Sequence, residues 1–551
     1  MGNIFKKGFS ILLKKQSNIL SAAFVIGTTI IISQILGLVR QRLLVSIFGA
    51  SNTLGVYLAS SRLPDFLFQI IIAGALSSAF IPIFSQYLGK EKYDDANRLG
   101  SSLLLLGLFL FFILGIILFI FAREFSMLIA PGFSKVQLDL MGNLTRIIIL
   151  GEILFIVGSF LSAILQSYNH FFIPGIASAL YNLGIIIGIK FLSPFIGISS
   201  AAVGVVLGAF IFMIVQLPLV QRVGFSFKPS FSLGTKGVKD VIKLMAPRTL
   251  SIGVYQLGTI LIVTLISFLP TPGRSYVIFD YAQTLAFAPV VLFGQAIAQA
   301  AFPILSREKD KLDSFKTTFV TSFNQMLYLV LPVSALFLVL RIPIVRLIYG
   351  ASQFDWPATV LTGKTLAFFS ISIFASALSY LISRGFYALH DTKTPLIIGT
   401  VTTIVMIALG AIFIFIEHLG VESIAIAFSI ATILNIVLSF VFLDIKVGGF
   451  DKRLLFSSVL KILVATIFTG LALYIPIKLL DQLVFDTTRT VGLLLLTGIS
   501  SFAGLSFYLF LTWLLNVKEA LGYLLLFRKV GDWRQILGRS EEVIEGTRLN
   551  P

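Results

Sequence analysis

The residues of this sequence that could do chemistry are charged and amide side chains inside long apolar segments. Arg62, Asp65 and Gln69 follow one another at helical spacing, and Asp280 and Gln283 form a second group. An ionisable group at the centre of a bilayer costs at least about 2.5–3.5 kcal/mol, so such groups normally face a bundle interior or a water-filled cavity. We therefore expect these side chains to line a polar cavity inside a helical bundle.

Arginine predominates over acidic residues in the first of these segments. Arg40 lies near the end of an apolar segment that also contains Gln34, and Arg248 lies at the start of a later one. A planar guanidinium matches the geometry of phosphate oxygens. The sequence therefore favours an anionic, phosphate-bearing ligand over a cationic drug, and Arg40, Arg62 and Arg248 are the candidates to bind it.

Most of these side chains also have a purely structural interpretation. Arg62 and Asp65 are three residues apart, so they would share a helix face and pair with each other. Arg40 would extend to the membrane interface. Asp280 would lie at a helix N-terminus, where the helix macrodipole favours an acid. Beside these alternatives, the candidates for a cavity or gating role are Gln34, Asp65, Gln69, Asp280 and Gln283.

The composition is typical of a membrane protein. Apolar residues make up 57% and charged residues 12% of the 551 residues, and the mean hydropathy is +0.99, whereas soluble chains hold roughly 45–50% and about 25%. Cysteine is absent and histidine occurs three times, which excludes disulfides and thiolate metal sites. No metal or other cofactor is expected. Nucleotide-binding and hydrolase motifs are also missing, so we expect a transporter rather than an enzyme.

Windows of about 20 apolar residues predict fourteen membrane-spanning helices, because the hydrocarbon core is about 30 Å thick and a helix rises about 1.5 Å per residue. Two of them, 54–88 and 276–305, are weaker because polar residues interrupt them. The other predicted spans are 18–39, 100–122, 147–166, 172–192, 198–220, 249–269, 322–340, 365–383, 396–416, 424–444, 458–477 and 491–515.

The charge of the loops indicates the orientation. Lysine and arginine number 42 against 25 acidic residues, a net charge of +17. A cytoplasmic N-terminus places most of the loop lysines and arginines on the cytoplasmic side, as the positive-inside rule expects. Both termini are then cytoplasmic, and the charge attracts anionic lipid headgroups rather than nucleic acid, for which no motif is present. The amphipathic segments 221–243 and 517–551 are expected to lie on the membrane surface.

Glycine and proline interrupt several spans, and helices bend at such residues. The candidate hinges are Gly74, Pro82, Pro289 and Gly294. The segments 79–85 and 301–306 are similar and occupy equivalent places in two blocks of six spans, which suggests a weak internal duplication. Parallel repeats of this kind predict two lobes that rock around a central site and give alternating access.

Several short motifs occur in this sequence in the order in which one known family has them. They are Ser33–Arg40, Ile47–Ala50, Arg62–Asp65, Ala130–Phe133, Leu244–Leu250, Leu347–Gly350 with Phe354–Asp355, and Phe386–Pro395. Together they resemble the MurJ (MviN) lipid II flippases of the multidrug/oligosaccharidyl-lipid/polysaccharide exporter superfamily.

The resemblance implies an all-α polytopic membrane protein in which two six-helix lobes form a V and two added helices hold a polyprenyl tail. With the predicted spans, it implies an N-terminal lobe at 1–220, a cytoplasmic linker at 221–243 and a C-terminal lobe at 244–445. The two extra helices then fall at 446–516 and a cytoplasmic tail at 517–551.

The resemblance also implies an activity. Undecaprenyl-diphosphate-linked peptidoglycan precursor, lipid II, would move from the inner to the outer leaflet of the bacterial cytoplasmic membrane, with Arg40 at the diphosphate. The expected partners are this lipid-linked glycan and the membrane lipids, and the protein is expected to act as a monomer.

The chain differs from the family at several charged positions. Gln34 stands where the family often has arginine, Ala73 where it has glutamate and Gln283 where it has aspartate. An exporter of another polyprenyl-linked oligosaccharide therefore remains an alternative. A cation-coupled drug exporter is a second one, disfavoured by a shortage of intramembrane carboxylates, and a membrane scaffold without transport is a third.

Overall fold

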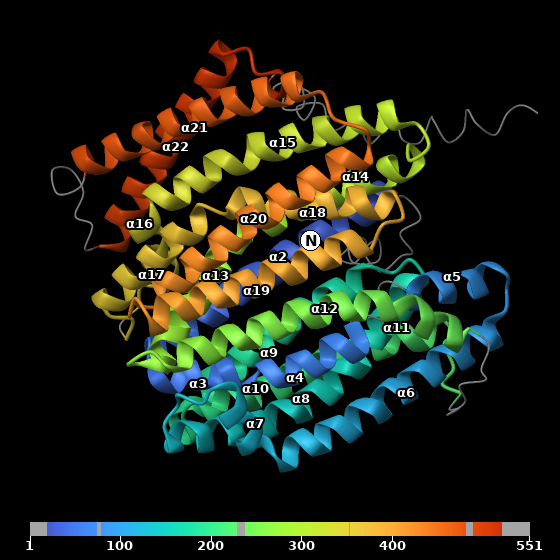
Figure 1. Ribbon diagram of the computed structural model, residues 1–551. Coiled ribbons are helices and arrows are strands. Elements are labelled where there is room, and N and C mark those ends of the chain that lie inside the picture. The colour runs from blue at the N-terminus through green and yellow to red at the C-terminus, as the bar shows by residue number, and fades with distance from the viewer. Residues whose placement is uncertain (1–18, 74–78, 229–236, 352, 481–488, 521–551) are drawn as a thin grey trace, which may run out of the picture. The chain divides into compact units, whose positions relative to one another are not determined.

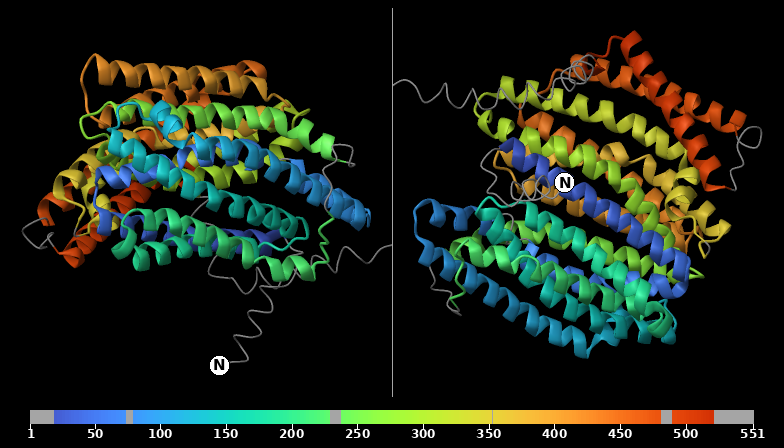
Figure 2. Two further views of the ribbon diagram at one scale, coloured as in Figure 1. Left: turned by 90° about the horizontal axis from the view of Figure 1, so that it is seen from below. Right: turned by 180° about the vertical axis from the view of Figure 1, so that it is seen from behind.

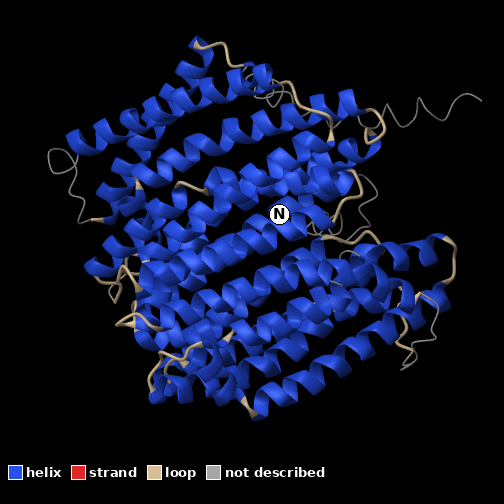
Figure 3. Ribbon diagram, viewed as in Figure 1, coloured by secondary structure: helices blue, strands red, loops and turns tan. Residues whose placement is uncertain are grey.

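The computed structural model describes residues 19–73, 79–228, 237–351, 353–480 and 489–520, which fold into helices (Figure 1). These ranges contain no strand (Figure 3). Within them, eleven helices are long and apolar enough to cross a membrane, or up to twelve if one bent pair counts as a span. The protein is therefore an all-α, multi-pass membrane protein, as predicted, and the count of fourteen spans stays a prediction.

The chain divides into two compact units. Unit 1 lies within Met1–Ala282, Ile348–Thr365 and Gly399–Ala431, and unit 2 within Gln283–Leu347, Leu366–Ile398 and Thr432–Pro551. The predicted lobes divide the chain in a different way, and they stay a prediction. The predicted surface segments 221–243 and 517–551 lie outside the described residues at 229–236 and 521–551, respectively.

Helices that lie wholly or mainly in unit 1 include α2 (Ile19–Phe48), α3 (Asn52–Ser60), α4 (Arg62–Phe68), η1 (Gln69–Ala73), α5 (Ile81–Gly89), α6 (Tyr93–Ile120), α7 (Ala122–Ile129), α8 (Lys135–Ser167), α9 (Phe172–Ile196), α10 (Ser199–Ile214), α11 (Leu217–Arg222), α12 (Val238–Ser267), α13 (Pro272–Pro289), α17 (Trp356–Ser370) and α19 (Lys393–Phe415). Unit 2 includes most or all of η3 (Val290–Gln295), α14 (Ala296–Arg307), α15 (Leu312–Val339), α16 (Arg341–Tyr349), α18 (Ile373–Ala388), α20 (Glu422–Lys446), α21 (Lys452–Leu480) and α22 (Thr490–Leu514).

Long apolar helices form the interior of unit 1. There α8 packs against α10, and α9 packs against α2 and α10 (Figures 1 and 2). The backbones of α9 and α10 meet closely, because a Cβ atom at Gly184 would lie 2.4 Å from the Cα of Gly208. Small residues permit such close approach between membrane helices, whose association depends on packing. Glycine at these two positions therefore holds α9 and α10 together as a tight pair.

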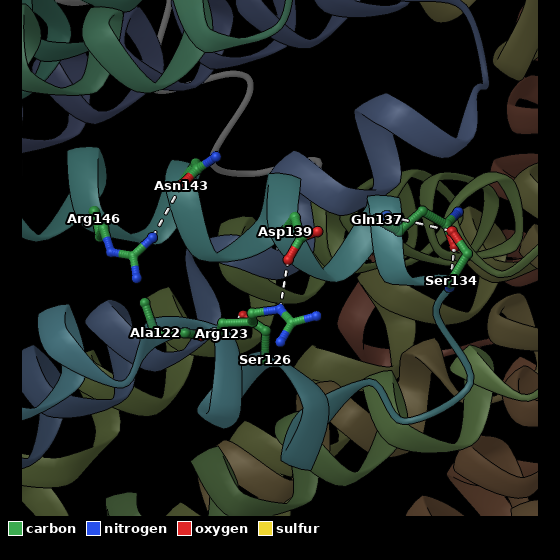
Figure 4. A network of polar contacts seen from close by, with 8 residues as sticks. All are labelled: Ala122, Arg123, Ser126, Ser134, Gln137, Asp139, Asn143 and Arg146. Atoms are coloured by element: carbon green, nitrogen blue, oxygen red, sulfur yellow. Dashed lines mark hydrogen bonds and ion pairs between the residues drawn. The ribbon is translucent and has the colours of Figure 1, made fainter.

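A polar network fixes the corner between α7 and α8 (Figure 4). The Oγ of Ser134 accepts a hydrogen bond from the N–H of Gln137 at 3.3 Å, and the Oε1 of Gln137 accepts one from the N–H of Ser134 at 2.8 Å. This capping box satisfies two N–H groups at the start of α8. The exposed pair Arg123–Asp139, 2.5 Å apart, joins the two helices. Exposed ion pairs contribute at most about 1 kcal/mol each, so this network orients a corner without forming a site.

Both of the weaker predicted spans contain a π-helical segment. In the segment 54–88, η1 directly follows α4, and in the segment 276–305, η3 directly follows α13. Pro289 ends the regular helix before η3, since proline lacks the N–H that would continue the hydrogen-bond ladder. Short π-helical segments occur frequently at functional sites in proteins.

The structure places three of the four hinge candidates. Pro82 occupies the first turn of α5, where a helix tolerates a residue without an N–H. Pro289 and Gly294 are buried, and Gly294 packs against Ala377 of α18 within unit 2. Gly74 lies outside the described residues. A hinge role for these four residues stays a prediction.

Candidate functional site

A polar cavity with a volume of about 250 Å³ lies within unit 1. Seven helices contribute to it: α2, α3, α4, α8, α9, α10 and α13. Its polar lining consists of Arg40, Gln41, Tyr57, Ser61, Arg62, Asp65, Glu152, Tyr181 and Asp280. Four residues predicted from the sequence, Arg40, Arg62, Asp65 and Asp280, therefore meet in one cavity.

The short helices α3 and α4 bring two of these residues to the cavity. Ser51 caps α3 by accepting a hydrogen bond from the N–H of Leu54 at 3.2 Å. Gly55 of α3 then packs against the start of α13, so closely that a Cβ atom there would collide with the carbonyl oxygen of Gly273. Because α3 contacts α13 in this way, Arg62 at the start of α4 comes within reach of α13.

Arg62 is held by two side chains of α13. Its Nη2 donates to the carboxylate of Asp280 at 2.5 Å, and its Nε donates to the hydroxyl of Tyr276. The guanidinium also lies over the ring of Tyr276, 5.6 Å from the ring centroid. The prediction that Arg62 pairs with Asp65 was therefore wrong. Arg62 forms its ion pair with Asp280, whose carboxylate α13 holds 2.5 Å from the guanidinium.

Asp280 does not lie at a helix N-terminus. Helix α13 begins at Pro272, so Asp280 is two turns inside the helix. The macrodipole interpretation of this residue was wrong, because the polar sequence before Asp280 is helical rather than a loop. Its side chain is largely buried, with 14% exposed, and neutralises Arg62.

Arg40 differs from Arg62 in that no acidic side chain in the described part of the chain forms an ion pair with it. It lies in α2, is half-buried and lines the cavity. No ion pair or hydrogen bond joins its side chain to another described residue. Its position in the cavity favours a ligand-binding role over extension to the membrane interface, and that role stays a prediction.

The remaining predicted residues do not line the cavity. Gln34 is exposed on α2, Gln69 is the half-buried first residue of η1, and Gln283 is a half-buried residue of α13 that belongs to unit 2. Arg248 lies in α12, but its side chain is outside the described part of the chain.

Glu152 and the tyrosines of the site were not among the residues predicted from the sequence. Glu152 is only 5% exposed in α8 and lines the cavity together with Tyr181 of α9. It is the single charged residue within the apolar run 147–166, and an isolated charge in a predicted span was a sufficient signal. The expected shortage of intramembrane carboxylates was wrong, since Asp65, Glu152 and Asp280 line one cavity.

A family model described as "Lipid II flippase MurJ" matches residues 44–514 of this chain. The chain belongs to the MurJ family. A MurJ family protein of Buchnera aphidicola subsp. Schizaphis graminum, described as "Probable lipid II flippase MurJ", is 29% identical over 507 residues, which cover 89% of this chain and 97% of that protein. The family resemblance seen in the sequence motifs is thereby confirmed.

Two solved structures match the fold of this chain. A lipid II flippase MurJ in an inward closed conformation matches with a TM-score of 0.72 at 24% identity, covering 88% of this chain and 98% of that chain. An inward-facing multidrug resistance transporter of the MATE family, within the MOP superfamily, matches with a TM-score of 0.64 at 15% identity, covering 76% and 94%. The MOP-type fold expected for the MurJ family is therefore confirmed.

Proposed function

We propose that this MurJ family member moves lipid II from the inner to the outer leaflet of the bacterial cytoplasmic membrane by alternating access. The observation that carries the proposal is the family match over residues 44–514, together with a cavity in which Arg40 forms no ion pair with any described residue. An unpaired arginine in a confined polar site attracts an anion, and the anionic group of a polyprenyl-diphosphate-linked glycan is its diphosphate.

The dimensions of the cavity suit this group. A volume of about 250 Å³ is below the range of about 300–1,000 Å³ that is usual for ligand pockets. It is sufficient for a diphosphate and insufficient for a whole disaccharide-pentapeptide. In the proposed complex, Arg40 donates to the diphosphate, Gln41 and Ser61 offer further hydrogen bonds, and the sugar and peptide lie outside the cavity.

The proposal includes an arrangement in the membrane. Both termini face the cytoplasm, two lobes at 1–220 and 244–445 rock against each other, and the protein works as a monomer without a cofactor. The net charge of +17 supports this orientation through its distribution over the loops.

A second candidate is an exporter of a different polyprenyl-linked oligosaccharide. One observation favours it: Asp280 neutralises Arg62, so only Arg40 remains as an unpaired cation among the described cavity residues. A substrate with less charge than lipid II would fit this balance.

The test is expression of the chain in a bacterial strain whose own lipid II flippase is depleted. Growth and surface labelling of lipid II are expected to recover, and mass spectrometry of the purified protein is expected to find lipid II. If the protein inserts into the membrane but growth fails and another polyprenyl-linked glycan co-purifies, the second candidate replaces the first.

A further inference from the structure

Glu152 is a buried acid for which the cavity provides no partner. Its side chain is 5% exposed, and its Oε2 atom has no hydrogen-bond partner among the residues that the structure describes. A carboxylate that is buried without a donor is costly to keep ionised, so the surroundings favour the neutral, proton-bearing form. Binding of the diphosphate by Arg40 does not require Glu152, so the proposed function leaves Glu152 without a role.

The charges that share the cavity with Glu152 determine what its ionisation does. The titratable and charged groups facing the cavity are Arg40 of α2, Tyr57 of α3, Arg62 and Asp65 of α4, Tyr181 of α9 and Asp280 of α13. Helix α10 contributes only an apolar side chain. Arg62 and Asp280 form an ion pair, and the charges of Arg40 and Asp65, which form no ion pair with each other, cancel in the sum. The cavity is therefore neutral while Glu152 holds a proton and becomes negative when it loses one.

We propose that Glu152 binds a proton together with the anionic group of the substrate, and that loss of this proton expels the anion. The inference rests on the proposed function, because the anion is the diphosphate that Arg40 binds. A negative cavity opposes an incoming anion, whereas a neutral one with a free arginine admits it. By linkage, the anion raises the affinity for the proton by the same factor as the proton raises the affinity for the anion.

The structure favours a proton over a metal cation at Glu152. No group of three acidic or histidine side chains close enough to hold a metal ion occurs in the described ranges. A proton requires only one carboxylate oxygen, and the unpartnered Oε2 supplies it. Dependence on sodium is accordingly an outcome of the test that would contradict the proposal.

The experiment measures ligand affinity against pH with the full chain in lipid nanodiscs. The probe is a short-chain prenyl diphosphate ester of N-acetylglucosamine, in which both phosphates are esterified so that its charge stays constant between pH 6 and 9. The dissociation constant of the unaltered protein is expected to rise with pH, approaching about tenfold per pH unit where Glu152 is ionised in the free protein. Glu152→Gln keeps the side chain neutral, so its affinity is expected to stay high and constant across this range.

Calorimetry in buffers of different ionisation enthalpy counts the protons directly. The unaltered protein is expected to take up close to one proton on binding at the alkaline end of this range, and Glu152→Gln none. Glu124→Gln is the matched control, because Glu124 is an exposed acid on α7, outside the cavity. It is expected to behave as the unaltered protein does.

Three other results would contradict the role of Glu152 as a proton-binding group. Affinity that is independent of pH in the unaltered protein overturns the inference, even if Glu152→Gln does not fold. Proton uptake that persists in Glu152→Gln, or affinity that follows sodium instead of pH, overturns it too, and in all three cases the proposed function stands. Failure of the probe to bind at any pH overturns both the inference and the diphosphate-binding role of Arg40.

Discussion

The guanidinium of Arg62 and the carboxylate of Asp280 lie 2.5 Å apart, although 218 positions separate the two residues in the chain. This pair joins α4 to α13 at the wall of the cavity and removes one positive charge from the set available to a ligand. Arg40 is left as the unpaired cation in the described lining of the cavity.

Arg40→Ala is expected to abolish rescue of a flippase-depleted strain while the protein still inserts into the membrane. Removing a charged donor costs about 1.5–3 kcal/mol, so affinity for the diphosphate probe should fall by about 10- to 100-fold. Calorimetry in nanodiscs checks the affinity. Arg146→Ala removes a half-buried arginine of α8 that lies outside the cavity and should leave both rescue and affinity unchanged. Full rescue by Arg40→Ala would remove Arg40 from the binding role.

The Arg62–Asp280 pair is expected to couple α4 to α13 energetically. A double-mutant cycle with Arg62→Met and Asp280→Asn should give a coupling energy of about 0.5–3 kcal/mol, because the two side chains are largely buried and in contact. Unfolding in a mixed-micelle denaturant titration supplies the free energies. The same cycle on the exposed pair Arg123–Asp139 should give about 1 kcal/mol or less. Equal coupling energies for the two pairs would contradict the structural role assigned here.

Asp391, in the loop between α18 and α19 of unit 2, is expected to make the stability of the folded protein depend on pH in the acidic range. Its carboxylate accepts hydrogen bonds from the ammonium of Lys446 at 2.6 Å, and from the hydroxyl and N–H of Thr394 at 2.8 and 3.0 Å. Partial burial alone would raise the pKa of Asp391, but these hydrogen bonds outweigh burial and lower the pKa to about 2. An unfolded aspartate has a pKa of about 3.9. The stabilisation is therefore complete above about pH 4 and is lost as the pH falls toward 2.

The measurement for Asp391 is the melting temperature between pH 2.5 and 6, compared with that of Asp391→Asn. The melting temperature of Asp391→Asn should be lower at pH 6, and the difference should shrink on acidification. A difference that stays constant with pH would show that the carboxylate charge is not what stabilises this loop.

Gly184→Ala is expected to destabilise the protein by about 1–3 kcal/mol, the usual cost of overpacking. The added Cβ atom would lie 2.4 Å from the Cα of Gly208, and backbone atoms cannot turn away as a flexible side chain can. Gly399→Ala is the control, since a Cβ atom there meets nothing within 4 Å, and alanine favours a helix over glycine. Equal stability of the two variants in the same denaturant titration would mean that α9 and α10 separate without cost.

Local patterns in the sequence predicted the elements and several members of the site, but not how the members pair. Charge within an apolar segment singled out Arg40, Arg62, Asp65 and Asp280, and these four residues line one cavity of the structure. Their binding and gating roles stay predictions. The same rule, charge within an apolar segment, covers Glu152, the single charged residue of the apolar run 147–166.

Pairing depends on which helices pack together, and spacing along one helix carries no such information. Arg62 and Asp65 have the spacing of an ion pair, yet Arg62 binds Asp280 because Gly55 allows α3 to contact the start of α13. The position of Asp280 within its helix was mistaken for a related reason. The predicted span started at 276, where the apolar run begins, whereas the helix starts at Pro272.

The glycine contact between α9 and α10 has a mechanical consequence. A Cβ atom at Gly208 would lie 2.4 Å from the carbonyl oxygen of Tyr181. Tyr181, which lines the cavity from α9, therefore packs directly against the backbone of α10. We expect two helices packed this closely to move as a rigid unit, so the part of the cavity that they line should keep its shape. We therefore expect any widening that admits a ligand to come from other helices of the lining, among them α4, which runs directly into the π-helical turns of η1.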